Sequence, residues 1–134
     1  MKEIKKILIK KSLTGLGLYS NIQIKKGEFV IEYTGRRLTS KEANEKGGKY
    51  LFEINSRFTI DGSGRDNLAR YINHSCRPNC ESRIKNNHIL IFSIKEIKPG
   101  EELTYNYGKE YFNEYIKPFG CKCAYCKTKK LSII

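Results

Sequence analysis

The stretch RYINHSCRPNC, Arg70–Cys80, and the later stretch GEELTYNYG, Gly100–Gly108, decide how this chain is interpreted. The first places an Asn, a His, a Ser and two Cys within eight residues. The second places Tyr105 and Tyr107 two residues apart, which puts both on one face of a strand. Taken singly, the first is a polar turn whose side chains bond nearby backbone groups, and the second is an ordinary aromatic strand. It is therefore the order and spacing of the two stretches along the chain that indicate the fold and the function.

The composition limits the class of protein. The chain has 134 residues, 39% of them hydrophobic, and a net charge of +12. This length predicts one domain, and the apolar content excludes a disordered polycation. No apolar run approaches the roughly 20 residues that span a bilayer, and lysines interrupt the apolar N-terminal stretch, so we expect neither a membrane protein nor a secreted one. With five cysteines, an odd number, a disulfide framework is not expected.

The positive charge is concentrated at the two ends. Residues 1–12 carry a net charge of +4, residues 115–134 carry +5, and residues 13–114 carry only +3. Such ends are either solvated tails or contacts for a polyanion such as nucleic acid. The sequence leaves both interpretations open.

The local patterns predict many short strands and one or two short helices. Only three alanines occur while Ile and Tyr are abundant, which favours strands. Turn residues at Asn55-Ser56 and Asn86-Asn87 predict two hairpins, and Pro99-Gly100 predicts a turn. The predicted helices are Thr39–Glu45, ended by Gly47-Gly48, and Gly108–Ile116. The predicted strands are Ile4–Ile9, Gly27–Tyr33, Tyr50–Ile54, Arg57–Ile60, Cys80–Lys85, His88–Ile94 and Leu103–Tyr107.

Together the motifs resemble the SET-domain protein-lysine methyltransferases, from about Leu13 to Lys127. The matching motifs, in order, are Gly15-Leu16-Gly17, EYTG at Glu32–Gly35, Tyr50, Ile60-Asp61, NHSCRPN, GEELTYNYG and the final cysteines. The resemblance implies a mostly β fold of small curved sheets around a pseudoknot, with the NHSC segment against the ELTYNYG strand. It also implies a SET domain over residues 1–114, with a short central insert at about 39–66, and a post-SET cysteine segment over 115–134.

The implied reaction moves a methyl group from S-adenosylmethionine to a lysine amine. A free lysine has a pKa near 10.4, so about one in a thousand is neutral at physiological pH. A narrow aromatic channel lowers that pKa by removing water. By resemblance, Tyr107 is the catalytic tyrosine, Tyr50 is a second channel tyrosine, and Tyr105 tunes the product. A tyrosine at that last position predicts mono- or dimethyl-lysine.

The resemblance also implies a cofactor site and a zinc site. The implied cofactor residues are Gly15, Leu16, Gly17, Arg70, Asn73, His74, Tyr107 and Phe119, although many relatives have a bulky aromatic where this chain has Leu16. Three cysteines of the final segment and one from the NHSC motif would supply the four thiolates of a structural zinc ion. These are Cys76, Cys121, Cys123 and Cys126, with two residues between the last pair instead of the commoner four. Cys80 is then left as a core residue and His88 as a surface residue.

The expected substrate is a histone tail or another basic, lysine-containing protein, with a ribosomal protein nearly as plausible. The expected location is the nucleus with chromatin, or the cytoplasm, depending on the source. One alternative is a catalytically weak SET module that binds chromatin or nucleic acid through its basic ends. Another is a zinc-stabilised nucleic-acid-binding protein. For the final cysteines, the alternative to a zinc site is a tail of reduced cysteines without metal. Nothing in the sequence indicates an oligomeric state.

Overall fold

The computed structural model describes residues 6–12, 15–108, 116–117, 120–121 and 123. Four sheets of two or three strands make up the described part, with one α-helix and one 3-10 helix. The fold class predicted from the sequence is thus confirmed. The predicted helix at Gly108–Ile116 and the side chains of Phe119 and Cys126 lie outside the described residues, apart from the two ends of that helix.

The first sheet is an antiparallel pair of β1, Ile7–Ser12, and β2, Gly15–Ser20. The predicted first strand, Ile4–Ile9, is wrong in its bounds, because pairing with β2 carries the strand on through two exposed lysines to Ser12. The glycines at positions 15 and 17 lie within β2, which sequence reasoning did not predict as a strand. β2 contributes Leu18 to the core, where it is fully buried.

The second sheet has the order β3–β9–β8. β3 spans Phe29–Tyr33, β8 spans Cys80–Lys85 and β9 spans His88–Ser93. Asn86 and Asn87 join β8 to β9 with φ angles of 51° and 64°, which Asn tolerates well, so the predicted hairpin is confirmed.

The third sheet has the order β4–β6–β5 and carries α1. β4 spans Arg36–Thr39, β5 spans Leu51–Glu53 and β6 spans Phe58–Asp61. The helix α1, Ser40–Lys46, is capped by Thr39 and Glu42, each bonding the other's backbone N–H, and it ends at Gly47. The predicted helix and the predicted β5–β6 hairpin are both confirmed.

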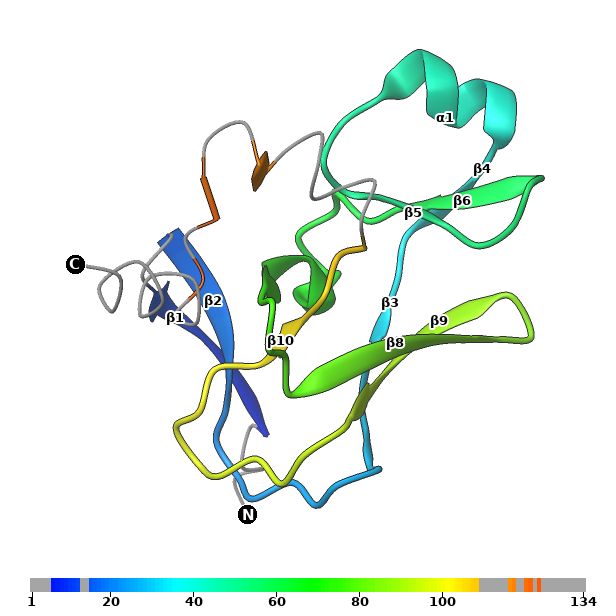
Figure 1. The fold of residues 1–134 in the computed structure, drawn as a ribbon. Helices are drawn as coiled ribbons and strands as arrows, with labels where there is room; N and C mark the ends of the chain where they lie inside the picture. Colours follow the sequence, from blue (N-terminus) through cyan, green and yellow to red (C-terminus); the bar gives the residue numbers. More distant parts are fainter. Residues whose placement is uncertain (1–5, 13–14, 109–115, 118–119, 122, 124–134) are drawn as a thin grey trace.

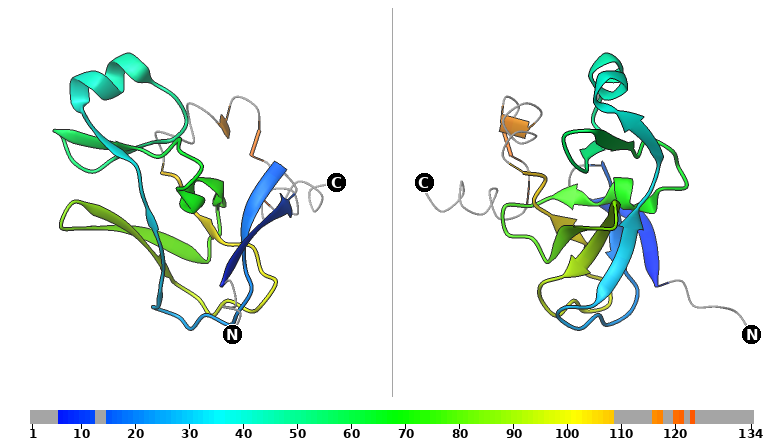
Figure 2. Two further views of the ribbon diagram at one scale, coloured as in Figure 1. Left: turned by 180° about the vertical axis from the view of Figure 1, so that it is seen from behind. Right: turned by 90° about the vertical axis from the view of Figure 1, so that its right-hand side faces the viewer.

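The fourth sheet is a parallel pair of very short strands in the middle of the molecule. β7, Asn73–His74, pairs with β10, Thr104–Tyr105, so the predicted strand Leu103–Tyr107 is shorter than expected. The 3-10 helix η1, Leu68–Tyr71, precedes β7. Figure 1 shows this pair between the β1–β2 sheet and the two larger sheets. Figure 2 shows α1 above the β4–β6–β5 sheet, away from this centre, in two further views.

One hydrophobic core connects the sheets. Its members come from every sheet, and the fully buried ones include Leu18, Ile89, Ile91, Ile97 and Leu103. Cys80 belongs to the same core, as predicted, and burial raises the pKa of its thiol to about 12. No helix in the described ranges is long and apolar enough to cross a membrane.

Candidate active site

The site is assembled by the contact between the NHSCRPN segment and the GEELTY segment. Beyond the β7–β10 pairing, Ser75 N–H donates to the Tyr105 carbonyl at 3.2 Å. Asn79 bridges the two segments with its side chain: Nδ2 donates to the Glu102 carbonyl at 2.8 Å, and Oδ1 accepts from Thr104 N–H at 2.9 Å. The NHSC segment therefore lies against the ELTYNYG strand, as the resemblance implied.

Tyr107 is held at two points. Its N–H donates to His74 Nδ1 at 3.1 Å, and its hydroxyl donates to the Ile72 carbonyl. The two rings of Tyr107 and His74 meet edge to face with centroids 5.4 Å apart. Because His74 Nδ1 accepts a hydrogen bond, the neutral ring carries its proton on Nε2. Burial lowers the pKa of His74, which favours that neutral form.

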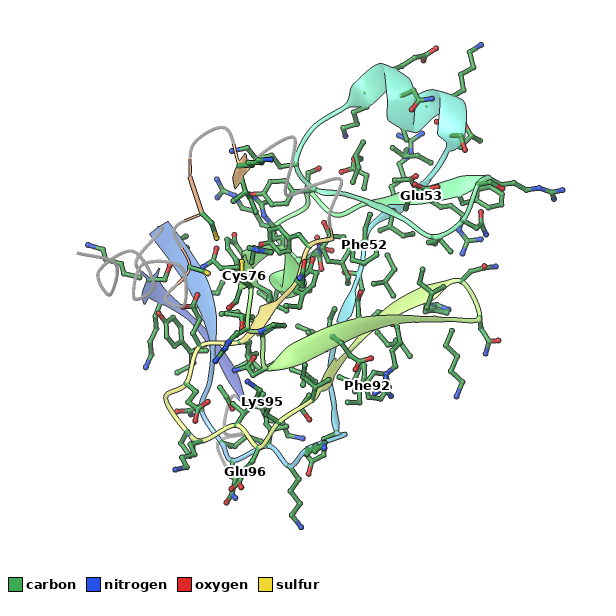
Figure 3. All side chains as sticks on the ribbon, in the orientation of Figure 1. Phe52, Glu53, Cys76, Phe92, Lys95 and Glu96 are labelled. Carbon is green, nitrogen blue, oxygen red and sulfur yellow. The ribbon has the colours of Figure 1, made fainter. Side chains whose placement is uncertain are left out.

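Aromatic rings continue from Tyr107 into the β4–β6–β5 sheet. The ring centroids of Tyr105 and Tyr107 are 4.9 Å apart, and Phe52 stacks on Tyr105 at 6.4 Å. Phe52 also contacts Tyr33 at 5.3 Å, and Figure 3 labels it between β5 and the segment that contains β10. Sequence reasoning missed Phe52, although its place two residues after Tyr50 on a predicted strand was an available signal.

Tyr50 lies beside Arg70. The Arg70 guanidinium lies over the Tyr50 ring at 4.4 Å and over the Tyr71 ring at 5.2 Å, which is cation–π geometry. Its Nη1 donates to the Ser63 carbonyl, while its Nε is buried and has no partner among the residues described here. The Tyr50 carbonyl in turn accepts a hydrogen bond from the Tyr33 hydroxyl at 2.8 Å.

Asn73 lies against β1 and β2. Its Nδ2 contacts Ser12 Oγ at 3.2 Å, the Leu16 carbonyl at 3.1 Å and Glu102 Oε2 at 2.7 Å. Three of the predicted cofactor residues thus meet here, since Gly17 is also close to the Asn73 amide. Leu16 presents 52% of its surface to solvent, and a Cβ built on Gly15, whose φ is +124°, would meet no atom of the described residues within 4 Å. Sequence reasoning did not single out Ser12 or Glu102.

The predicted metal site is described in part. Cys76, labelled in Figure 3, has its Sγ 3.8 Å from Cys121 Sγ and 3.6 Å from His74 Nε2. Each of these three residues offers a ligand atom, and the three atoms lie within 4.8 Å of one another. The two sulfurs come from segments far apart in sequence, as the prediction requires. His74 was not predicted at this cluster, Cys123 is half-buried, and Cys126 lies outside the described residues.

Comparison with known proteins identifies the family. The family model of the SET domain matches residues 15–108, the span from the start of β2 to the residue after Tyr107. The chain belongs to the SET-domain family. Curated relatives of this SET domain include histone-lysine N-methyltransferase trithorax of Drosophila melanogaster, 38% identical over 125 residues, and histone-lysine N-methyltransferase 2D of Homo sapiens, 36% identical over 135 residues. These alignments cover 84% and 92% of this chain, which spans only 3% and 2% of those relatives.

Structural alignment with solved structures supports the same family. A chain in the crystal structure of the Chaetomium thermophilum polycomb repressive complex 2 aligns with a TM-score of 0.75 at 34% identity, covering 84% of this chain and 16% of that chain. A structure of ctPRC2 in an autoinhibited conformation bound to S-adenosylmethionine aligns with a TM-score of 0.70 at 35% identity, covering 79% and 15%.

Proposed function

We propose that this SET domain is an S-adenosylmethionine-dependent protein-lysine N-methyltransferase. The observation that carries the proposal is Tyr107, fixed by His74 and the Ile72 carbonyl at the junction of the two defining motifs and continuous with an aromatic cluster. The family match and the histone-lysine methyltransferases among its relatives support the same activity.

The residues of the predicted cofactor site fit the donor molecule. S-adenosylmethionine supplies a methyl group on a sulfonium, together with a purine and a charged amino-acid end. Arg70 Nε is buried and has no partner among the described residues, so it is a donor that such a polar ligand would satisfy. The open space at Gly15 and the exposed Leu16 side chain leave room on β2 for a ligand to approach. Asn73 and His74 would bind and orient its polar groups, and Phe119 stays a predicted contact.

The aromatic cluster provides an apolar environment for the acceptor lysine. Phe52, Tyr105 and Tyr107 form a surface of rings that would exclude water from a lysine side chain and favour its neutral amine. The Tyr107 hydroxyl would orient that amine for an in-line attack. A phenol hydroxyl is a poor base at neutral pH, so the proposed role of Tyr107 is positioning and electrostatic, and the amine loses its proton to solvent.

Tyr105 is the residue proposed to limit the degree of methylation. It is 6% exposed, and its ring packs between those of Phe52 and Tyr107. A hydroxyl there would hold a water that occupies the space of an additional methyl group. We therefore propose mono- or dimethyl-lysine as the product.

A structural zinc ion bound by Cys76, Cys121, Cys123 and Cys126 is part of the proposal. The pair of sulfurs from Cys76 and Cys121 suits a thiolate-binding metal. His74 would serve as an outer partner of this site and not as a ligand, because its Nδ1 is occupied by Tyr107 N–H and its Nε2 carries the proton. Nε2–H would then donate to the Cys76 thiolate.

A histone or another basic protein is the proposed substrate, in keeping with the names of the relatives. A location at chromatin follows from that substrate, whereas contact of the basic ends with nucleic acid stays a prediction. The near-neutral charge of residues 13–114, with 16 basic and 13 acidic residues, would not repel a basic peptide.

The decisive experiment is methyl transfer from labelled S-adenosylmethionine to core histones, with the methylated lysines identified by mass spectrometry. Tyr107→Phe should lower kcat by about 10²-fold or more, because it removes a hydroxyl that acts in the transition state. Tyr19→Phe is the matched control: it also removes one hydroxyl, which bonds the Lys11 carbonyl at 3.1 Å on an exposed edge. Equal activity of the two variants would contradict the proposed role of Tyr107.

A further inference from the structure

Glu102 is the second glutamate of the GEEL segment, but its contact with Asn73 does not follow from that motif. Its Oε2 lies 2.7 Å from Asn73 Nδ2, which is a short, charge-assisted hydrogen bond. We propose that Glu102 is a positioning residue for cofactor binding, which acts by fixing the orientation of the Asn73 carboxamide. The inference rests on the proposed function, since it assumes that Asn73 binds the cofactor.

The orientation of the Asn73 amide follows from the partners of its nitrogen. The Leu16 carbonyl and the Glu102 carboxylate are both pure acceptors, so the group facing them must be the NH2. The two hydrogens of Nδ2 are then directed at those acceptors, and Ser12 Oγ at 3.2 Å completes the set. Oδ1 therefore points to the other side of the amide, where it can accept a hydrogen bond from a ligand.

Gly17 makes this arrangement possible. A Cβ built on Gly17 would lie 2.5 Å from Glu102 Oε2, 3.2 Å from Asn73 Nδ2 and 3.1 Å from Ser12 Cβ. The first distance is one that real Cβ atoms do not adopt, so any side chain at position 17 would displace the carboxylate. Here the glycine leaves room for the Glu102–Asn73 pair, whereas the sequence analysis had placed it only among the cofactor residues.

The backbone of Glu102 is itself held from two sides. Glu102 forms an isolated antiparallel β-bridge with Tyr19 of β2, and its carbonyl accepts the hydrogen bond from Asn79 Nδ2 at 2.8 Å. Burial, and then the nearby carboxylate of Glu102, raise the pKa of the Tyr19 hydroxyl. The carboxylate is thus placed by rigid elements before any ligand arrives.

The site presents a ligand with the oriented Asn73 Oδ1, and the Glu102 carboxylate lies on the other side of the same amide. This combination favours a cationic donor, and the α-ammonium of the amino-acid end is the part of S-adenosylmethionine with that character. Removal of the carboxylate should therefore weaken binding of the amino-acid end, while the reacting centre at Tyr107 is left alone.

The test compares Glu102→Gln with Glu101→Gln, an exposed neighbour of the same charge. Glu102→Gln should raise both the KM for S-adenosylmethionine and the calorimetric Kd for S-adenosylhomocysteine about 10-fold. This is the effect expected when one charge-assisted hydrogen bond is lost. kcat at saturating cofactor should stay within about twofold of the wild-type value, because the interaction stabilises the bound cofactor equally in the ground state and in the transition state. Glu101→Gln should behave as the wild type in all three measurements.

Gly17→Ala provides a second, independent arm. It should raise the same KM by displacing the carboxylate, and it should add little to the effect of Glu102→Ala, because the tightest contact of the new methyl group, the one with Glu102 Oε2, is then removed. An unchanged Kd in Glu102→Gln, or fully additive effects of Gly17→Ala and Glu102→Ala, would overturn the role of Glu102 while the methyltransferase stands. A wild-type chain that fails to bind S-adenosylhomocysteine would instead overturn the proposed function itself.

Discussion

Replacement of Asn79 by Ala should destabilise the junction of the two defining motifs. The Asn79 side chain accepts from Thr104 N–H at 2.9 Å and donates to the Glu102 carbonyl at 2.8 Å, so its loss leaves one backbone donor and one backbone acceptor without a protein partner. Each such group costs about 1–3 kcal/mol when water does not replace the partner. Because Asn79 is half-buried and water reaches part of the junction, we take the low end for each group and expect about 2–3 kcal/mol in total.

Urea denaturation of Asn79→Ala measures this loss as a lower free energy of unfolding. Asn106→Ala is the matched control, since Asn106 is exposed and its Oδ1 accepts a hydrogen bond from the nearby Gly108 N–H at 2.9 Å. We expect less than about 1 kcal/mol from the control. A loss of under about 1 kcal/mol in Asn79→Ala, equal to the control, would refute the view that this side chain joins the two segments.

The other predictions concern the product, the metal and pH. Tyr105→Phe should shift the product toward more methyl groups per lysine, and identical mass-spectrometric distributions would rule out the role of its hydroxyl. Removal of metal by a chelator, or Cys121→Ser, should release about one zinc ion per chain and reduce activity, so activity retained in a metal-free chain would remove the zinc site from the proposal. Asp61 is half of an ion pair with Lys46: burial opposes the ionised form, but hydrogen bonds from Lys46 and Ser63 prevail and hold its pKa below the ordinary value. Its contribution is therefore complete above about pH 4 and lost as pH falls through the lowered pKa, so the stability gap between wild type and Asp61→Asn should narrow in denaturation at pH 3.

Local chemistry allowed much of the fold to be predicted. The α1 helix follows from Thr39 and Glu42, and the β8–β9 hairpin follows from Asn86 and Asn87, because each depends on residues within a few positions. The bounds of β1 were missed because they depend on pairing with β2, and the two lysines at its end carry no apolar signal.

The candidate site was predicted through family motifs, and its contacts were not. Tyr107 and Asn73 follow from their motifs, but nothing local indicates that Phe52 would meet Tyr105, or that Glu102 would meet Asn73. Those contacts join residues about 30 to 50 positions apart, which periodicity and turn chemistry do not encode. The contact between His74 and Cys76 was also missed, although these residues are only two positions apart, because β7 ends at His74 and no strand pattern places Cys76 relative to it.

The two-residue ladder between β7 and β10 has a consequence for how the molecule reaches its native state. Asn73 and Thr104 are 31 positions apart, and the β8–β9 hairpin between them can form from neighbouring residues alone. Closing the longer loop costs chain entropy before its few hydrogen bonds are gained, so this ladder should form late in folding. It should also open early, and the Ser75 amide, which donates to the Tyr105 carbonyl, should exchange with deuterium faster than the amides of β9. The geometry around Tyr107 should therefore form late in folding and open early.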